Sequence, residues 1–98
     1  MAKDLKIGAL LDVYGAFLSQ KQRVLCEHYY NDDLSLAEIA ENEDITRQGV
    51  RDIIHRATLQ LEEFENSCHY FENFNNLKKL SEDMENNKEQ IKAIIDNL

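Results

Sequence analysis

The chain contains no proline, no tryptophan and only three glycines among its 98 residues. Folds built from many short strands need frequent turns, so this scarcity argues against sandwiches and barrels and favours helices. No apolar run approaches the roughly 20 residues that cross a bilayer, and the first six residues lead into an amphipathic pattern rather than a signal-peptide core. These absences predict an all-α, cytoplasmic protein without membrane insertion.

Residues that could bind a metal or perform catalysis are sparse. Cys26 and Cys68 stand apart without the CxxC spacing of zinc sites, so reduced and partly buried thiols are expected. The three histidines, at positions 28, 55 and 69, are dispersed, and neither a glycine-rich phosphate loop nor a nucleophile motif is present. We therefore expect a protein that is not an enzyme and that has no metal and no cofactor.

The net charge is −8, and it is unevenly distributed. Residues 61–98 carry nine Asp or Glu against four Lys or Arg, whereas residues 47–60 carry Arg47, Arg51 and Arg56 against Asp52 alone. An acidic chain repels nucleic acid and suits a basic partner. One helix-length segment is nevertheless locally basic.

Two helices are predicted before residue 34. Apolar residues recur at helical spacing from about Asp4 to about Phe17. Ser19 with Gln22 has the form of a capping box, which starts a second helix, and the run Asn31-Asp32-Asp33 ends it. Four aromatic residues are expected in the core: Tyr14, Phe17, Tyr29 and Phe64.

The next two predicted helices surround a tight turn. Ser35 with Glu38 forms a second capping box, and Thr46 is a good N-cap for the helix that follows. Ala40 is small where the two helices would cross, and Asp44 suits the left-handed backbone of the turn. An apolar stripe continues along the second helix: Val50, Ile53, Ile54, Ala57, Leu61 and Phe64. This order predicts a helix-turn-helix at residues 35–66.

The outer face of the second helix carries side chains suited to recognition. Arg and Gln pair bidentately with guanine and adenine edges, although surface Arg and Gln also occur on helices that only face solvent. The candidates on this face are Arg47, Gln48, Arg51 and His55. Further candidates for phosphate contacts are Lys21, Arg23 and Arg56.

From about residue 70 the apolar spacing changes to seven, which predicts a helical arm at residues 70–98. The residues at this spacing are Tyr70, Leu77, Met84, Ile91 and Leu98. Ser81 and Lys88 interrupt the companion positions, so we expect the arm to pack on its own domain or on a second copy rather than to form a free coil. Candidates for a homodimer or partner surface are Tyr70, Phe71, Phe74 and Leu77. No linker is visible, so residues 1–98 are treated as one domain.

Four phrases of the sequence closely resemble the YlxM family, small bacterial proteins whose helix-turn-helix is similar to the fourth region of sigma factors. They are KQR at 21–23, YYNDDLSLAEIAE at 29–41, ITRQGVRDIIHRA at 45–57 and LEEFE at 61–65. The resemblance implies a non-enzymatic, cytosolic protein encoded beside the targeting GTPase of the signal recognition particle. It also implies a role in assisting or regulating that particle, through the GTPase or its RNA–protein complex.

The same resemblance implies a set of recognition positions: Thr46, Arg47, Gln48, Arg51, Asp52 and His55. Gly49 stands where alanine is common in the family, and glycine there costs about 1 kcal/mol of helix propensity. Either tight packing or a looser helix start is therefore implied. A sequence-specific DNA-binding regulator that uses the helix starting at Thr46 remains the alternative function.

Overall fold

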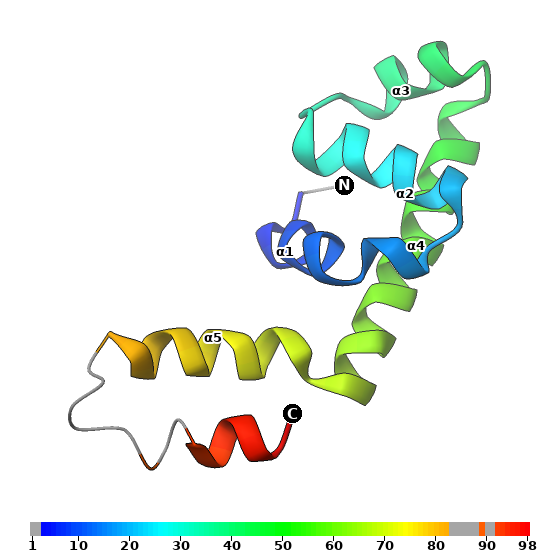
Figure 1. The fold of residues 1–98 in the computed structure, drawn as a ribbon. Coiled ribbons are helices and arrows are strands. Elements are labelled where there is room, and N and C mark those ends of the chain that lie inside the picture. Colours follow the sequence, from blue (N-terminus) through cyan, green and yellow to red (C-terminus); the bar gives the residue numbers. More distant parts are fainter. Residues whose placement is uncertain (1–2, 83–88, 90–91) are drawn as a thin grey trace. The chain divides into compact units, whose positions relative to one another are not determined.

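A computed structural model of the protein describes residues 3–82, 89 and 92–98 (Figure 1). Within these ranges the regular structure is helical and contains no strand, which confirms the all-α prediction. The chain divides into two compact units, Met1–Phe64 and Glu65–Leu98. No helix in the described ranges combines the length and apolar character that crossing a bilayer would require.

The first unit begins with two pairs of short helical elements. The helix α1 spans Leu5–Tyr14 and continues into a single 3-10 turn, η1, at Gly15–Phe17. The helix α2 spans Gln20–Cys26 and continues into a π-helix, η2, at Glu27–Asn31. Both α1 and α3, which spans Leu36–Glu43, pack against η2, so this π-helix connects the first helix with the helix-turn-helix.

The helix-turn-helix follows, made of α3 at Leu36–Glu43 and α4 at Arg47–Cys68. The predicted capping boxes are both present: Ser19 and Gln22 exchange hydrogen bonds at the start of α2, and Ser35 and Glu38 do so at the start of α3. Each box satisfies two backbone donors that a helix start would otherwise leave unpaired. The predicted helix starts are therefore confirmed.

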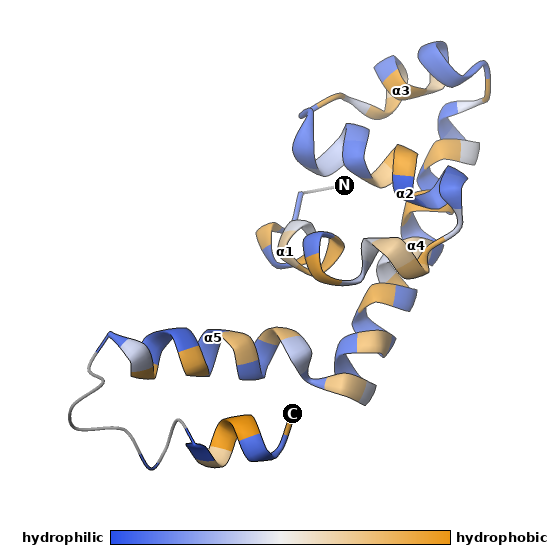
Figure 2. Cartoon of the chain, in the orientation of Figure 1, coloured by the Kyte–Doolittle hydropathy of each residue, from blue (hydrophilic) through white to orange (hydrophobic). Residues whose placement is uncertain are grey.

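The core of the first unit is an apolar cluster to which α4 contributes one continuous stripe. Figure 2 shows how hydrophobic and hydrophilic residues alternate around this helix. Val50, Ile54, Ala57 and Leu61 are fully buried, as the spacing predicts, and Ile53 and Phe64 are half-buried. Full burial of each large aliphatic side chain contributes about 1.5–3 kcal/mol.

The prediction for Phe17 is wrong, because its side chain is 72% exposed. The α-helix ends at Tyr14, and the 3-10 turn that follows winds more tightly, with about 3.0 residues per turn. Helical spacing from the preceding residues therefore no longer sets the direction of Phe17. Its ring instead lies edge-on to that of Phe64, with the centroids 5.9 Å apart.

The second unit contains α5, which spans Tyr70–Ser81, and a helical stretch at residues 92–96. The Glu65 carboxylate accepts hydrogen bonds from the backbone N–H groups of Phe71 and Glu72, at 3.0 and 3.1 Å, and so caps the start of α5. No residue of α5 is buried. The heptad residues Met84 and Ile91 lie outside the described residues.

Candidate functional site

The turn between α3 and α4 sets the orientation of α4, whose first residues form the candidate site. Asp44 adopts left-handed backbone, with φ 54° and ψ 46°, and its N–H bonds to the carbonyls of Ala40 and Glu41. The N–H of Ile45 also bonds to the carbonyl of Ala40, at 3.1 Å. The chain then enters α4 at Thr46, whose hydroxyl accepts a hydrogen bond from Gly49 N–H at 3.0 Å. The predicted turn residue and N-cap are confirmed.

The first two turns of α4 present their cations to solvent. Arg47 and Arg51 are both exposed and lie one turn apart, because four residues nearly complete a helical turn. With Leu36 and Gln48 they line a shallow concavity of about 440 Å³. Within the described residues neither arginine forms an ion pair. Both guanidinium groups are therefore available to bind a carboxylate or a phosphate bidentately.

Gln48 and Asp52 act as a pair on the same exposed surface. The Gln48 side-chain amide donates to the Asp52 carboxylate at 2.9 Å, one turn further along α4. This bond fixes the orientation of the amide and leaves its oxygen and a second N–H group available. It also places a carboxylate on the surface proposed for recognition.

The structure does not bring all of the predicted recognition and phosphate-contact residues together. His55 is exposed two turns beyond Arg47, and Arg56 lies about 180° around α4 from Arg47. On α2, Lys21 lines a separate concavity beside Glu43, while Arg23 pairs with Glu27 at 3.8 Å.

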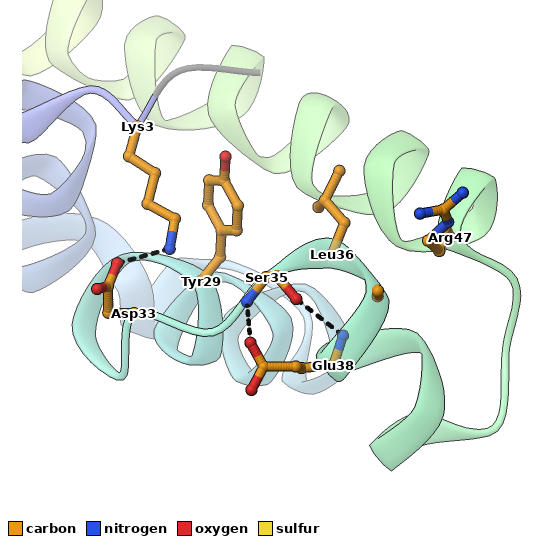
Figure 3. Close-up of a pocket in the computed structure, with 8 residues that line it drawn as sticks. Lys3, Tyr29, Asp33, Ser35, Leu36, Glu38 and Arg47 are labelled. Atoms are coloured by element: carbon orange, nitrogen blue, oxygen red, sulfur yellow. Dashed lines mark hydrogen bonds and ion pairs between the residues drawn. The ribbon is translucent and has the colours of Figure 1, made fainter.

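A second concavity, of about 380 Å³, adjoins the first and involves the N-terminal segment (Figure 3). The Lys3 ammonium pairs with Asp33 at 2.7 Å, donates to the Leu34 carbonyl at 3.1 Å and lies 4.5 Å from the centroid of the Tyr29 ring. Sequence reasoning missed Lys3, because nothing in the local pattern links it to an acid 30 residues away.

Both carboxylates at this second concavity are held in the ionised form. The hydrogen bond from Lys3, together with its charge, lowers the pKa of Asp33. Hydrogen bonds from the backbone and side chain of Ser35 lower the pKa of Glu38. Asp33 also takes left-handed backbone, with φ 57°.

His28 joins η2 to the end of α3. Its Nδ1 lies 3.1 Å from the Asp32 carboxylate and its Nε2 lies 3.4 Å from that of Glu43. In the part of the chain that the structure describes, no group of three or more His, Cys, Asp or Glu residues is arranged to hold a metal ion.

The two cysteines differ in environment. Cys26 is fully buried, and this burial, with a smaller contribution from the charge of Glu27, raises the pKa of its thiol to about 11. Cys68 is exposed rather than partly buried as expected, because it ends α4 just before the left-handed residue His69. Both thiols are free.

Comparison with known proteins agrees with the helix-turn-helix geometry. The model of the UPF0122 family, described as "Putative helix-turn-helix protein, YlxM / p13 like", matches residues 1–98. The chain belongs to this family. A UPF0122 protein of Clostridium kluyveri is 41% identical over 98 residues, covering 100% of this chain and 82% of the relative.

Two other UPF0122 relatives extend the comparison. That of Fusobacterium nucleatum is 34% identical over 96 residues, which covers 96% of this chain and 93% of the relative. That of Shouchella clausii is 42% identical over 78 residues, covering 80% of this chain and 72% of the relative. The resemblance noted from the sequence phrases is thus confirmed, and this UPF0122 member is a helix-turn-helix protein.

Proposed function

We propose that this UPF0122 member is a non-enzymatic accessory protein of the signal recognition particle, acting in the cytoplasm. It binds the particle's GTPase or its RNA–protein complex through the start of α4. The observation that carries the proposal is the exposed pair Arg47 and Arg51, which forms no ion pair with any residue that the structure describes, on a chain of net charge −8. The YlxM resemblance supports the choice of partner.

The charge distribution suits a compact partner better than a long polyanion. Each phosphate contact needs its own cation, and the contacts made by a protein set both its affinity for DNA and the salt dependence of that affinity. The concavity at the start of α4 contains two arginines, and Asp52 stands beside them. The acidic remainder of the chain favours association with a basic protein surface.

Binding of the purified particle tests this proposal. We expect immobilised protein to retain the particle at micromolar concentration and to change its GTP turnover. Replacing Arg47 and Arg51 by Ala should weaken retention about tenfold or more, since charge-assisted bonds are the strong polar contacts. Lys78→Ala with Lys79→Ala on α5 removes the same charge and should have little effect. Absence of both retention and any change in turnover would end the proposal.

A sequence-specific DNA-binding regulator is the second candidate, favoured by the oriented Gln48 amide beside Arg51. This pair has the donor and acceptor pattern that reads adenine and guanine edges in a major groove. Selection from random duplexes at low salt should then return a motif, and Arg51→Ala should relax one of its positions. A pool without enrichment contradicts this function.

A further inference from the structure

The two concavities of the helix-turn-helix form one continuous surface, because Leu36 and Arg47 line both. We call this surface the Leu36 strip. One end is bounded by Asp33 and Glu38 and the other by Arg47 and Arg51. Figure 3 shows Leu36 between Ser35 and Arg47, at the start of α3.

The charges of the Leu36 strip are separated by sign. At the end near Asp33, Lys3 is the cation among the described residues that line the strip, and it is already bonded to Asp33 and to the Leu34 carbonyl. The Glu38 carboxylate accepts a hydrogen bond from the Ser35 backbone N–H, the Glu38 N–H donates to the Ser35 hydroxyl, and Glu38 forms no ion pair within the described residues. That end therefore keeps a net negative charge, while Arg47 and Arg51 make the other end positive.

This separation disfavours a nucleic-acid backbone on the Leu36 strip. A strand of phosphates that reached Arg47 and continued past Leu36 would next meet two carboxylates, and both are ionised because their pKa values are lowered. Like charges in contact cost several kcal/mol in an interface, which selects against the wrong class of partner. A partner with both signs of charge avoids this cost.

The middle of the Leu36 strip is apolar. Leu36 is half-buried, Ala37 lies next to it, and the buried ring of Tyr29 borders the same concavity. The concavities are open and near the lower end of the roughly 300–1,000 Å³ typical of ligand sites. Such a surface fits individual side chains of a polypeptide rather than an enclosed small molecule.

We infer that the Leu36 strip binds a polypeptide segment with an apolar side chain on Leu36, an acidic side chain on Arg47 and Arg51, and a basic side chain on Glu38. This inference rests on the proposed function, and it assigns the contact to the protein component of the particle. The RNA then binds elsewhere or not at all.

Removal of the negative end tests the inference, because the two partner classes respond with opposite sign. The variant Asp33→Asn with Glu38→Gln removes two charges and keeps the local structure, since Asn tolerates left-handed backbone and Gln completes a capping box. The control Glu62→Gln with Glu63→Gln removes two exposed charges from α4. The probes are the purified GTPase, the particle's RNA alone, the assembled particle and a duplex DNA at low salt.

We expect the Asp33→Asn, Glu38→Gln variant to bind the GTPase about tenfold more weakly, and the control to change this affinity less than twofold. Binding of RNA or DNA should rise or stay the same. Arg51→Gln should also weaken GTPase binding, because the segment needs both ends of the strip. Circular dichroism and thermal melting show whether each variant is folded.

Three other outcomes would overturn the inference in distinguishable ways. Unchanged or tighter GTPase binding by the Asp33→Asn, Glu38→Gln variant means that the segment does not use the negative end, although the proposed function stands. Particle binding through RNA alone, strengthened by the same variant, assigns the strip to nucleic acid. No binding of the unaltered protein to the GTPase, the RNA or the assembled particle ends the proposed function as well.

Discussion

Asp33, Asp44 and His69 take left-handed backbone, and each stands where one helical element ends and another begins. Asp and Asn tolerate this conformation better than most residues, because a short polar side chain can bond to the local backbone. Asp44 also donates its N–H to two carbonyls at the end of α3. Single residues of suitable chemistry thus set where the helix-turn-helix bends.

Glu38 gives the first prediction at this scale. Its pKa is lowered in the folded protein by the bonds from Ser35, so its contribution to stability is present above the unfolded pKa and is lost as pH falls through the folded pKa. Glu38→Gln keeps a neutral acceptor that does not titrate. We therefore expect the free energy of unfolding to fall less between about pH 7 and pH 3 in this variant than in the unaltered protein.

Urea unfolding followed by circular dichroism at the two pH values measures this difference. Glu62→Gln is the matched control, because Glu62 is exposed on α4 and caps no helix. An equal loss of stability in the Glu38→Gln variant and the unaltered protein would show that the capping carboxylate does not contribute to the acid response.

At the scale of elements, the start of α4 answers the question raised by Gly49. A Cβ atom on Gly49 would lie 3.2 Å from the Thr46 hydroxyl oxygen, which caps the helix. Of the two explanations for Gly49, tight packing and a looser helix start, this contact supports tight packing. The hydroxyl that satisfies the Gly49 N–H also restricts what side chain the same residue can carry.

Gly49→Ala should consequently stabilise the protein by less than the about 1 kcal/mol of its helix propensity. The added methyl group displaces the cap, and loss of a threonine cap typically costs about 1 kcal/mol. In a Thr46→Ala background the crowding is absent, so the same change should give nearly the full gain. A double-mutant cycle by urea unfolding measures the coupling. Equal effects in both backgrounds would contradict the steric account.

Local signals predicted most of the elements but missed features that depend on packing or on residues distant in the sequence. Capping boxes at Ser19 and Ser35 and the N-cap at Thr46 could be recognised because each uses residues three apart. The π-helix and the exposure of Phe17 could not, since both depend on how the helices pack. The Lys3 contact joins residues 30 apart in sequence, so no periodic pattern contains it.

The candidate site was predictable in part for the same reason. Arg47, Gln48 and Arg51 share a helix, so their spacing alone placed them at one surface. The neighbouring surface carries two ionised carboxylates, those of Asp33 and Glu38. Their positions depend on how residues 29–38 fold around Lys3, which the spacing does not show. Sequence spacing identified the cations, and the three-dimensional arrangement revealed the charge separation.

At the scale of the whole molecule, α5 carries an exposed apolar surface of the kind that often binds a partner. Tyr70 and Phe74 are 57% and 62% exposed, and Phe71 and Leu77 are half-buried. Exposed aromatic residues that gather on one helix often mark association surfaces. A homodimer formed through these residues is the prediction that the sequence already raised.

Phe74→Glu or Leu77→Glu should shift the protein toward monomer, because a buried unpaired charge at a dimer interface is strongly unfavourable. Sedimentation velocity over a range of concentrations measures the shift, and we expect at least a tenfold rise in the dissociation constant. Asn75→Glu adds the same charge at an exposed position of α5 and serves as the control. Sedimentation that is the same for all three variants and the unaltered protein would refute a dimer built there.

The π-helix η2 has a consequence for how the family can vary. A π turn holds about one more residue than an α turn, shown here by the Asp32 N–H bonding back five residues to the Glu27 carbonyl at 3.0 Å. Loss of one codon in this stretch would convert the wide turn to an ordinary one. Because the π turn and the α turn each complete one revolution, Asp33 would keep about the same direction around the helix axis, toward Lys3. A gene with such a deletion would therefore keep its reading frame, its helices and the ion pair between Lys3 and Asp33.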